Sequence, residues 1–496
     1  MKNLTILFCL LIHQCVLSQA DSYYSETYRP QFHFTPEKNW MNDPNGMVYF
    51  NGKYHLFYQY FPNGVVWGPM HWGHAESVDL LHWKHLPIAL YPDKLGWIFS
   101  GSAIVDKENT AGFGKNALIA IFTYHNDAIW KSGKKNTESQ ALAYSLDEGK
   151  TWLKYKGNPV LNNSGEQDFR DPKVFWNESS SRWNMVLAAG DKIKIFSSMN
   201  LKKWQFESDF KPLDDDKDLG VWECPDLLPM KVENSNEIKW LMIVNHGDKA
   251  PNGGSGTRYF IGDFDGKTFN ATQKAIWMDG GTDFYAAVTY SNAPNDKKIL
   301  LGWMSNWQYA TKVPTEVWRS AMTLPRELQL VKEKNTYLVT QKIIPEFCSL
   351  KKTVFELNEV ATPFVNKSVD LSQTEITFNA GDARDIIISI SNSKGEVFNV
   401  IVSDNKLVTD RSNSGLKDFN PTFTAKPQVM SLNDKRIESF QLIIDKSSIE
   451  ILLNDGQFSM TNLFFPTENY SILTIISKEN KPIRDLKIKS ISRVWK

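Results

Sequence analysis

Three acidic residues, Asp43, Asp171 and Glu223, each lie in a short polar motif that directly precedes an apolar run. Two carboxylates that flank a glycosidic bond can act as nucleophile and general acid, which is the usual equipment of glycoside hydrolysis. A third carboxylate could hold substrate hydroxyl groups. The three motifs therefore predict a site for sugar chemistry, provided that the fold brings them together.

The residues beside each carboxylate predict different protonation states. Glu223 has an aromatic residue and a thiol as neighbours, which favour desolvation and a protonated carboxyl suited to the general acid. Asp171 follows Arg170, whose cation favours an ionised carboxylate that orients hydroxyl groups. Asp43 lies among amide and backbone donors that stabilise an anionic nucleophile. Cys224 should point away from Glu223, because neighbouring strand residues face opposite sides, and it is expected to serve in packing.

Each motif also has a purely structural interpretation. Asn-Asp-Pro-Asn-Gly and Arg-Asp-Pro are good turn sequences, and either one alone is more often a loop than a catalytic centre. Their recurrence beside aromatic residues that can stack on sugar rings favours a site, the aromatic residues being Trp40, Tyr58, Trp67, Trp72, Trp303 and Trp307.

Two histidine pairs, His71 with His74 and His82 with His85, have the spacing of metal ligands. Residues three apart on a strand face opposite sides of the sheet, so neither pair forms a shared ligand set. No metal or cofactor is expected.

A weak internal repeat predicts how the carboxylates are positioned. Segments resembling S-x-D-x-x-x-W close successive units at Ser77 to Trp83, Ser145 to Trp152 and Ser198 to Trp204, with a looser copy at Gly262 to Phe269. Five similar openings precede short apolar runs, at Asn42, Ser100, Arg170, Glu223 and Asp283. Units of this size fit four-stranded propeller blades, whose first strands line a common axis. Five distant motifs would then converge on one pocket.

The chain changes character near residue 330. Sixteen of the 17 Trp lie at or before Trp318, and all nine His lie at or before His246. From about Pro345, short β-branched runs alternate with polar turns, as in an antiparallel sandwich. The fold class predicted is all-β, with a five-bladed β-propeller over residues 21–335 followed by a linker and a C-terminal β-sandwich over residues 336–496.

Composition and the N-terminal segment indicate where the protein functions and which partners it does not bind. Lys and Arg total 56 and Asp and Glu total 56, so the basic excess that nucleic acid requires is missing. Residues 1–20 read as a secretory signal, and no later segment is apolar enough to insert into a membrane. A secreted glycoprotein is expected, with N-x-S/T sequons at Asn162, Asn177, Asn270, Asn366 and Asn469. Beyond the signal only Cys224 and Cys348 remain, so one interdomain disulfide is conceivable and a disulfide scaffold is not.

The ordered motifs closely resemble those of glycoside hydrolase family 32, the β-fructofuranosidases, also called invertases or sucrases. The resemblance runs from about Gln31 to Cys348 and continues more weakly through the terminal segment. The motifs that carry it are Trp40-Met-Asn-Asp-Pro-Asn-Gly46, Phe57-Tyr-Gln-Tyr60, Trp72-Gly-His-Ala75, Phe99-Ser-Gly-Ser102, Phe169-Arg-Asp-Pro172, Trp222-Glu-Cys-Pro-Asp226 and Gly302-Trp-Met-Ser-Asn-Trp307.

The resemblance implies a retaining mechanism and a role for each acidic residue. Asp43 would be the nucleophile that attacks C2 of fructose, Glu223 the acid/base, and Asp171 the transition-state stabiliser. Six further positions are similar to the fructose pocket of the family, namely Asn42, Gln59, Trp67, Ser102, Arg170 and Asp283. Asp279 lies near the same last opening and is a further candidate. Phe61 departs from the pattern, because many relatives have Asn there, which puts the shape of the leaving-group side in question.

The leading functional hypothesis is a secreted β-fructofuranosidase that hydrolyses sucrose through a covalent fructosyl-enzyme. An inulin or levan hydrolase and a fructosyltransferase use the same chemistry and differ only in leaving group or acceptor. A non-catalytic sugar-binding glycoprotein is the remaining alternative, which the intact acidic set argues against. The expected partner is a small or oligomeric fructoside, and the sequence does not indicate an oligomeric state.

Overall fold

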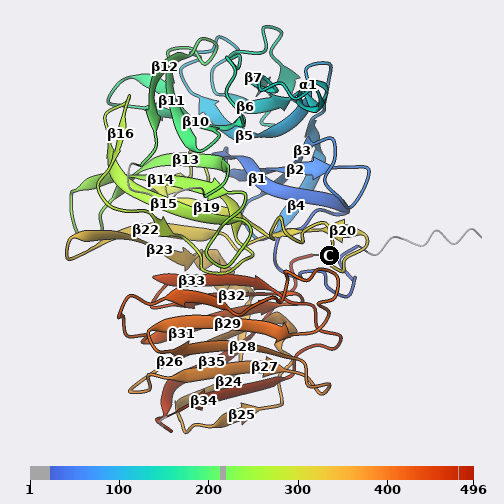
Figure 1. The fold of residues 1–496 in the computed structure, drawn as a ribbon, viewed down its shortest axis with the longest axis vertical. Helices are drawn as coiled ribbons and strands as arrows, with labels where there is room; N and C mark the ends of the chain where they lie inside the picture. Colours follow the sequence, from blue (N-terminus) through green and yellow to red (C-terminus); the bar gives the residue numbers. More distant parts are fainter. Residues whose placement is uncertain (1–22, 213–218, 479, 496) are drawn as a thin grey trace, which may run out of the picture.

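The computed structural model describes residues 23–212, 219–478 and 480–495, so the expected signal segment lies outside the described residues. Almost all regular structure in them is β-strand. The described helices are α1 (Asp127–Lys131) and the 3-10 helices η1 (Pro294–Asp296), η2 (Pro345–Leu350) and η3 (Leu371–Gln373). Figure 1 shows a propeller, blue to yellow, stacked on a sandwich, orange to red. The predicted fold class is confirmed.

Five antiparallel sheets form the blades, and each is built from strands that follow one another closely along the chain. Blade 1 contains β1 (Asn39–Phe50), β2 (Lys53–Phe61), β3 (His71–Ser77) and β4 (Trp83–Leu90), with β20 (Trp318–Arg319) parallel to β1. Blade 2 contains β5 (Trp97–Asp106), β6 (Ala117–His125), β7 (Glu138–Ser145) and β8 (Leu153–Lys154). Blade 3 contains β9 (Phe169–Asn177), β10 (Arg182–Ala189), β11 (Lys192–Ser198) and β12 (Gln205–Phe210).

The last two blades carry extra short strands. Blade 4 contains β13 (Trp222–Lys231), β14 (Ile238–His246), β15 (Gly256–Phe264), β16 (Phe269–Ala271) and β17 (Ile276–Trp277). Blade 5 contains β18 (Tyr285–Thr289), β19 (Ile299–Met304), β21 (Ala321–Met322), β22 (Arg326–Glu333) and β23 (Thr336–Ile343). The boundary expected after residue 335 falls between β22 and β23, so the propeller continues to Ile343 and η2 forms the link.

The repeat seen in the sequence corresponds to the turn between the third and fourth strands of a blade. In blade 1 the carboxylate of Asp79 accepts hydrogen bonds from the hydroxyl of Ser77 and from two backbone N–H groups of the turn. In blade 2 the carboxylate of Asp147 accepts hydrogen bonds from one backbone N–H group and from two hydroxyl groups. In blade 3 the side chain of Asn200 accepts from two backbone N–H groups. Asx side chains stabilise turns in this way, which explains the recurrence.

The innermost strand of every blade is bulged. The pairing of each innermost strand with the second strand of its blade shifts register near the start of the innermost strand, in β1, β5, β9, β13 and β18. Asp171, Cys224 and Ala286 have φ values of 65°, 42° and 52° at these bulges. β-Bulges re-aim side chains and recur beside active sites. The five innermost strands also contact one another in a closed ring, so the bulges face one axis.

The sandwich consists of two six-stranded sheets. One has the order β24 (Lys351–Val360), β35 (Ile483–Ile491), β26 (Thr374–Asn379), β31 (Ser439–Asp445), β32 (Ser448–Leu453) and β33 (Phe458–Leu463). The other has the order β25 (Phe364–Asn366), β34 (Ile472–Ser477), β27 (Ile386–Ser391), β28 (Val397–Ser403), β29 (Lys406–Asn413) and β30 (Gln428–Ser431). In β27 every second residue, namely Ile386, Ile388 and Ile390, is buried in the core between the sheets.

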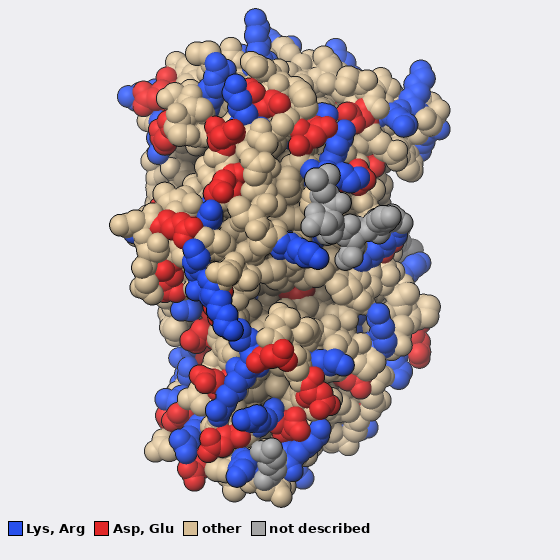
Figure 2. All heavy atoms as spheres, turned by 60° about the vertical axis from the view of Figure 1, so that its left-hand side comes forward, with Lys and Arg blue, Asp and Glu red and all other residues tan. Residues whose placement is uncertain are grey.

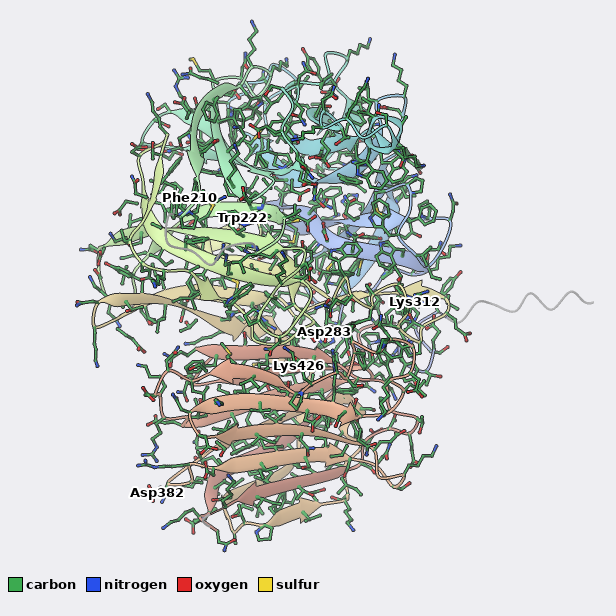
Figure 3. All side chains as sticks on the ribbon, viewed as in Figure 1. Phe210, Trp222, Asp283, Lys312, Asp382 and Lys426 are labelled. Atoms are coloured by element: carbon green, nitrogen blue, oxygen red, sulfur yellow. The ribbon has the colours of Figure 1, made fainter. Side chains whose placement is uncertain are left out.

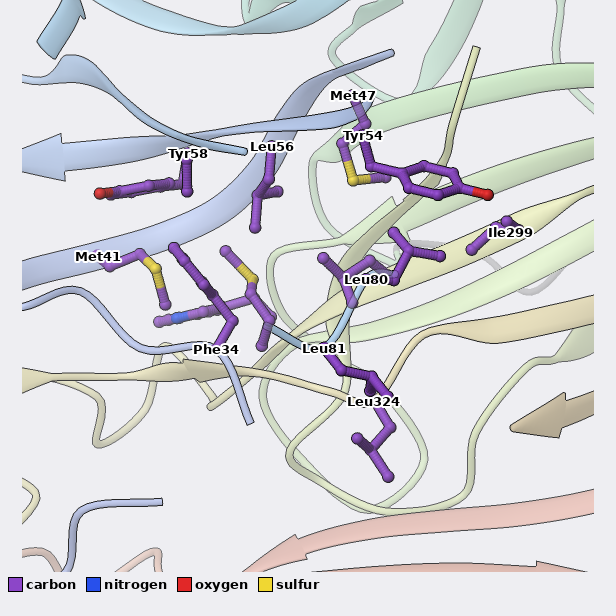
Figure 4. Packing of buried hydrophobic residues seen from close by; sticks show 14 of the residues in the cluster. Phe34, Met41, Met47, Tyr54, Leu56, Tyr58, Leu80, Leu81, Ile299 and Leu324 are labelled. Carbon is purple, nitrogen blue, oxygen red and sulfur yellow. The ribbon is translucent and has the colours of Figure 1, made fainter. Parts of the chain in front are cut away.

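Apolar packing joins the propeller to the sandwich. A large buried cluster combines Phe34 with Leu56 and Tyr58 of blade 1 and with blade 5, as Figure 4 shows. The same cluster reaches Ile443 and Leu452 of the sandwich. Removal of the sandwich would therefore expose apolar surface that now belongs to the core of both units.

Buried charges also cross this junction. Arg326 of β22 contacts Glu450 of the sandwich at 2.5 Å and Asp279 at 3.1 Å. His33 lies between Asp445 and Glu450, at 2.8 and 2.9 Å. Although burial alone lowers the pKa of His33, these two carboxylates raise it to about 9. Burial opposes ionisation of Glu450, yet Arg326 and His33 lower the pKa of Glu450 to about 2. The network is therefore charged near neutral pH.

The His33→Gln variant should be destabilised mainly at low pH. Because the pKa of His33 is raised by folding, its stabilising charge is fully present below about 6.5 and is lost as the pH rises through about 9. Removing one partner of a buried ion pair costs about 3–5 kcal/mol of the free energy of unfolding. Denaturant unfolding at pH 6 and pH 9.5 measures this difference, with exposed His82→Gln as the control. An equal loss at both pH values would show that shape, not charge, is what His33 contributes.

The face of the molecule shown in Figure 2 carries Lys and Arg side chains interspersed with Asp and Glu. Such mixing fits the balanced composition. None of the helices in the described residues is both long and apolar enough to cross a membrane.

Candidate active site

A cavity of about 450 Å³ lies at the N-terminal ends of the innermost strands. Asp43 of β1, Asp171 of β9 and Glu223 of β13 all line it, although more than 40 residues separate each from the next along the sequence. Ser100 of β5 and Trp307, which follows β19, complete the contribution of all five blades. Four of the five openings predicted to converge, at Asn42, Ser100, Arg170 and Glu223, therefore line one cavity.

Asp43 is held by three donors from two other blades and its own strand. The side-chain amide of Asn42 donates to Asp43 Oδ1 at 3.0 Å, and the hydroxyl of Ser100 donates to Oδ2 at 2.9 Å. Cys224 Sγ lies 3.5 Å from Oδ2. Trp40 in turn fixes Asn42, because its Nε1 donates to Asn42 Oδ1 at 2.8 Å. The carboxylate orientation is therefore set before any ligand binds.

Cys224, which strand alternation predicts to point away from Glu223 and to serve in packing, lies against both aspartates. Its Sγ is 3.6 Å from Asp171 Oδ2, and its backbone N–H donates to the same oxygen at 3.0 Å. The bulge in β13 and the positive φ of Cys224 break the strand alternation on which the expectation rested. Cys224 and Cys348 are both free thiols, so the conceivable disulfide between them is not formed.

Arg170 organises the wall beside Glu223. Its Nη2 and Nε contact Glu223 Oε1 at 3.1 and 3.3 Å. Its Nη1 donates to Glu138 at 3.1 Å and to Asp168 at 2.7 Å. The hydroxyl of Tyr285 donates to the other oxygen of Glu223. Three carboxylates share one guanidinium, which offsets part of the negative charge in the cavity.

The direction of the pKa shift agrees with the protonation state expected from the sequence for Glu223, and it contradicts the state expected for Asp171. Burial raises the pKa of Glu223, although Arg170 and Tyr285 act in the opposite direction. Burial also raises the pKa of Asp171, to about 8, against the lowering effect of Arg170. The ionised Asp171 expected beside Arg170 is therefore a wrong prediction, because the guanidinium makes its hydrogen bonds to Glu223, Glu138 and Asp168 and leaves Asp171 desolvated.

Comparison with known families identifies both parts of the chain. Residues 33–342 match the N-terminal domain of glycosyl hydrolases family 32, and residues 348–490 match the C-terminal domain of that family. The chain belongs to glycosyl hydrolase family 32. It is therefore a glycoside hydrolase, and the family resemblance read from the motifs is confirmed.

Several family 32 proteins resemble the chain over most of its length. A levanase of Bacillus subtilis is 44% identical over 99% of this chain and 74% of its own length. An extracellular exo-inulinase of Aspergillus niger is 36% identical over 90% of this chain and 91% of its own length. The solved exo-inulinase of Aspergillus awamori superposes with a TM-score of 0.85 at 33% identity, covering 95% of this chain and all of that one. A β-fructofuranosidase of Schwanniomyces occidentalis, solved with fructosyl-erythritol, gives a TM-score of 0.81 at 34% identity, covering 95% of this chain and 99% of that one.

Four of the six binding positions predicted by the family resemblance line the cavity, namely Asn42, Gln59, Trp67 and Arg170. Gln59 is almost fully buried, and its Nε2 has no hydrogen-bond partner within the described residues. A buried donor without a partner is costly, so this amide is available for a ligand oxygen. Most of the aromatic residues expected around the site, including Trp40, Trp72 and Trp303, are instead fully buried packing residues.

Asp283 does not line the cavity of this family 32 protein. Its carboxylate contacts Arg411 of the sandwich at 2.8 Å and accepts a hydrogen bond from the Tyr309 hydroxyl at 2.6 Å. Figure 3 places Asp283 at the junction of the two units. Asp279 behaves similarly, because it binds Arg326 and Thr461. The polar motif that precedes β18 thus resembles the motifs of the other four blades, but its acidic side chains bind the sandwich and the junction rather than line the cavity.

Ser102 also lies outside the cavity. Its hydroxyl donates to the carbonyl of Pro172 at 2.8 Å and accepts from the N–H of Val174 at 3.0 Å, so it joins blade 2 to blade 3. The bulge between Phe99 and Gly101 shifts the alternation of β5, and Ser100 takes the position facing Asp43. Both serines lie in the motif Phe99-Ser-Gly-Ser102, but the alternation rule for strands does not predict the bulge that decides which of them faces the cavity.

Ser100→Ala should mainly lower kcat/KM, whereas Ser102→Ala should mainly lower the free energy of unfolding. Loss of the hydrogen bond to charged Asp43 is worth about 1.5–3 kcal/mol, so Ser100→Ala should lower kcat/KM roughly ten- to a hundredfold. Ser102→Ala leaves the buried N–H of Val174 unpaired, which should cost about 1–3 kcal/mol of the free energy of unfolding. Steady-state kinetics and denaturant unfolding on both variants test the pair. The assignment is wrong if Ser102→Ala shows the larger kinetic loss.

The described residues contain no group of three or more His, Cys, Asp or Glu side chains arranged to hold a metal ion. His74 is buried and hydrogen-bonded to His55 at 3.1 Å. His82 pairs with Asp79 in a surface turn. The sequence indicated Ser100 only as the opening of a repeat unit. It missed Glu138, Asp168 and Tyr285, which reach Glu223 or its partner Arg170 from three different strands or loops.

Proposed function

We propose that this protein is a retaining β-fructosidase that releases terminal fructose from fructans of the levan or inulin type and from sucrose. The names of its relatives, levanase and exo-inulinase, favour fructans over the sucrose preference that led the hypotheses from the motifs. Secretion is part of the proposal, supported by the extracellular relatives and by the signal-like residues 1–20. The observation that carries the proposal is the meeting of three acidic side chains from three blades around one cavity.

The first chemical step forms a fructosyl-enzyme. A carboxylate oxygen of Asp43 attacks the anomeric carbon of the terminal fructosyl unit, and the bond from that carbon to the bridging oxygen breaks. Glu223, whose pKa is raised by burial, gives its proton to the departing oxygen. The hydrogen bonds from Asn42 and Ser100 support this role of Asp43, because they hold its carboxylate oriented.

The second step regenerates the enzyme. Ionised Glu223 takes a proton from water, the water oxygen attacks the anomeric carbon, and the bond to Asp43 breaks. Two displacements restore the original configuration. Asp171 contributes by hydrogen bonding to fructose hydroxyl groups, and its raised pKa lets a protonated carboxyl both donate and accept such bonds.

Product analysis tests the proposal directly. Purified protein is given sucrose, inulin and levan, and we expect fructose as the monosaccharide cut from both polymers. With methanol as a second acceptor, retention should give methyl β-fructofuranoside. The α-anomer would exclude the double displacement, and trisaccharides as main products from concentrated sucrose would indicate a transferase. If none of the three substrates is cleaved, the sugar-binding alternative takes precedence.

A further inference from the structure

Two exposed tryptophans mark the cavity. All 17 Trp lie within the described residues, and only Trp67 and Trp130 are exposed, at 40% and 60%. Both of them line the cavity that contains Asp43 and Glu223. The family resemblance already assigned Trp67 to the fructose pocket, whereas Trp130 has no role so far. Large apolar side chains left in water beside a polar cavity indicate a ligand with an apolar face.

Packing does not explain the position of Trp130. It belongs to α1, which connects β6 to β7 and has no buried residue. Its described ring contact is with His125, at 6.2 Å between ring centroids and an angle of 54°. Asn126 caps the helix by accepting from the N–H of Ile129, so the turn is held by its own backbone and cap. The helix therefore presents Trp130 without depending on it for stability.

A row of rings leads from the neighbourhood of Asp43 to Trp130. Phe99 precedes Ser100, which binds Asp43. The ring of His125 stacks on Phe99 at 4.3 Å and 8°, and Trp130 follows His125. Trp67 meets Phe99 edge-on at 6.1 Å. Trp130 is thus two ring contacts beyond Phe99, at the end of the row away from Asp43.

We propose that Trp130 is a stacking platform for a sugar unit of an oligomeric or polymeric fructan, beyond the unit that leaves first. This inference rests on the proposed function and adds a binding subsite to it. Sugar rings have an apolar C–H face and polar edges, so they suit an exposed indole flanked by hydrogen-bond donors. Lys134 and Lys135 supply such donors, because both line the same cavity. Sucrose has only one unit on the leaving side and would gain little from this platform.

The kinetic test compares substrates of different length. For Trp130→Ala, the ratio of kcat/KM on a fructan oligomer of five or more units to kcat/KM on sucrose should fall about three- to tenfold, mainly through KM on the oligomer. Trp130→Phe should restore most of the ratio. Phe206→Ala is the matched control, because Phe206 is an exposed aromatic residue of β12 outside the cavity and should leave the ratio unchanged.

Binding without turnover separates this inference from the proposed function. In the Asp43→Asn background, adding Trp130→Ala should raise the Kd for the oligomer by a similar factor in calorimetric titration. An unchanged Kd, an equal kinetic loss on sucrose and oligomer, or failure of Asp43→Asn to bind the oligomer would each overturn the platform. If the oligomer binds through Trp130 but wild type cleaves no fructoside, the proposed function fails while the subsite stands.

Discussion

Asp43→Asn is expected to reduce fructose release from sucrose and fructans by about 10⁴-fold or more, with the fold intact. An amide oxygen is too weak a nucleophile to form the fructosyl-enzyme, and removal of a covalent nucleophile leaves only binding and polar stabilisation. Asn keeps nearly the shape of Asp and can still contact Asn42 and Ser100. Fructose release under saturating substrate measures the loss, and thermal unfolding verifies that the variant is folded.

A surface aspartate gives the matched control for this variant. Asp263 of β15 has a side chain that is 60% exposed and pairs with Lys239, and neither residue lines the cavity. Asp263→Asn should retain wild-type turnover. Turnover by Asp43→Asn above about one hundredth of wild type would remove Asp43 from the nucleophile role, because no covalent route would then depend on it.

Glu223→Gln is expected to lower kcat by about 10²- to 10⁴-fold, the usual contribution of a general acid. The loss should depend on the leaving group, since a fructoside whose leaving group needs no proton bypasses the acid in the first step. Burial raises the pKa of Glu223, so in wild type the proton is available to higher pH than an exposed Glu would allow. Activity should fall on the alkaline side as Glu223 ionises, and Glu223→Gln should lose this alkaline limb.

The pH profile of kcat/KM on a fructan tests Glu223 beyond the size of the rate loss. Glu178→Gln is the control, because Glu178 is exposed in the turn between β9 and β10. It should keep both rate and profile. A Glu223→Gln variant that is slow but retains the alkaline limb would assign that limb to another group, with Asp171 as the first candidate since its pKa is about 8.

Much of the molecule was predictable from local sequence rules. The turn motif of Asp79 and Asp147 recurs because several blades use the same turn between their third and fourth strands, so the repeat predicted a propeller. The openings at Asp43, Asp171 and Glu223 predicted a shared site because first strands meet at the axis. Alternating β-branched runs were sufficient to predict the sandwich.

What could not be predicted depends on bulges and on contacts between domains. The family resemblance assigned Ser102 to the pocket, but the extra residue in β5 places Ser100 there instead. Strand alternation fails for Cys224, because a single extra residue in β13 reverses it. Asp283 resembles the other openings, and only the position of Arg411 in the folded sandwich shows why it is acidic. The pKa of Asp171 depends on where the Arg170 side chain binds, which adjacency in sequence does not determine.

The first and last described segments of the chain meet at the junction of the two units. Tyr24 and Trp495 stack face to face at 4.2 Å, and Trp495 Nε1 donates to the carbonyl of His33 at 3.0 Å. The two ends of the described part of the chain thus lie close together, and a short linker could join residue 495 to residue 23. New ends could then be opened in an exposed turn of blade 3 or 4, away from the cavity. This protein is accordingly a good scaffold for circular permutation, in which a fusion partner is attached at a turn that does not line the cavity.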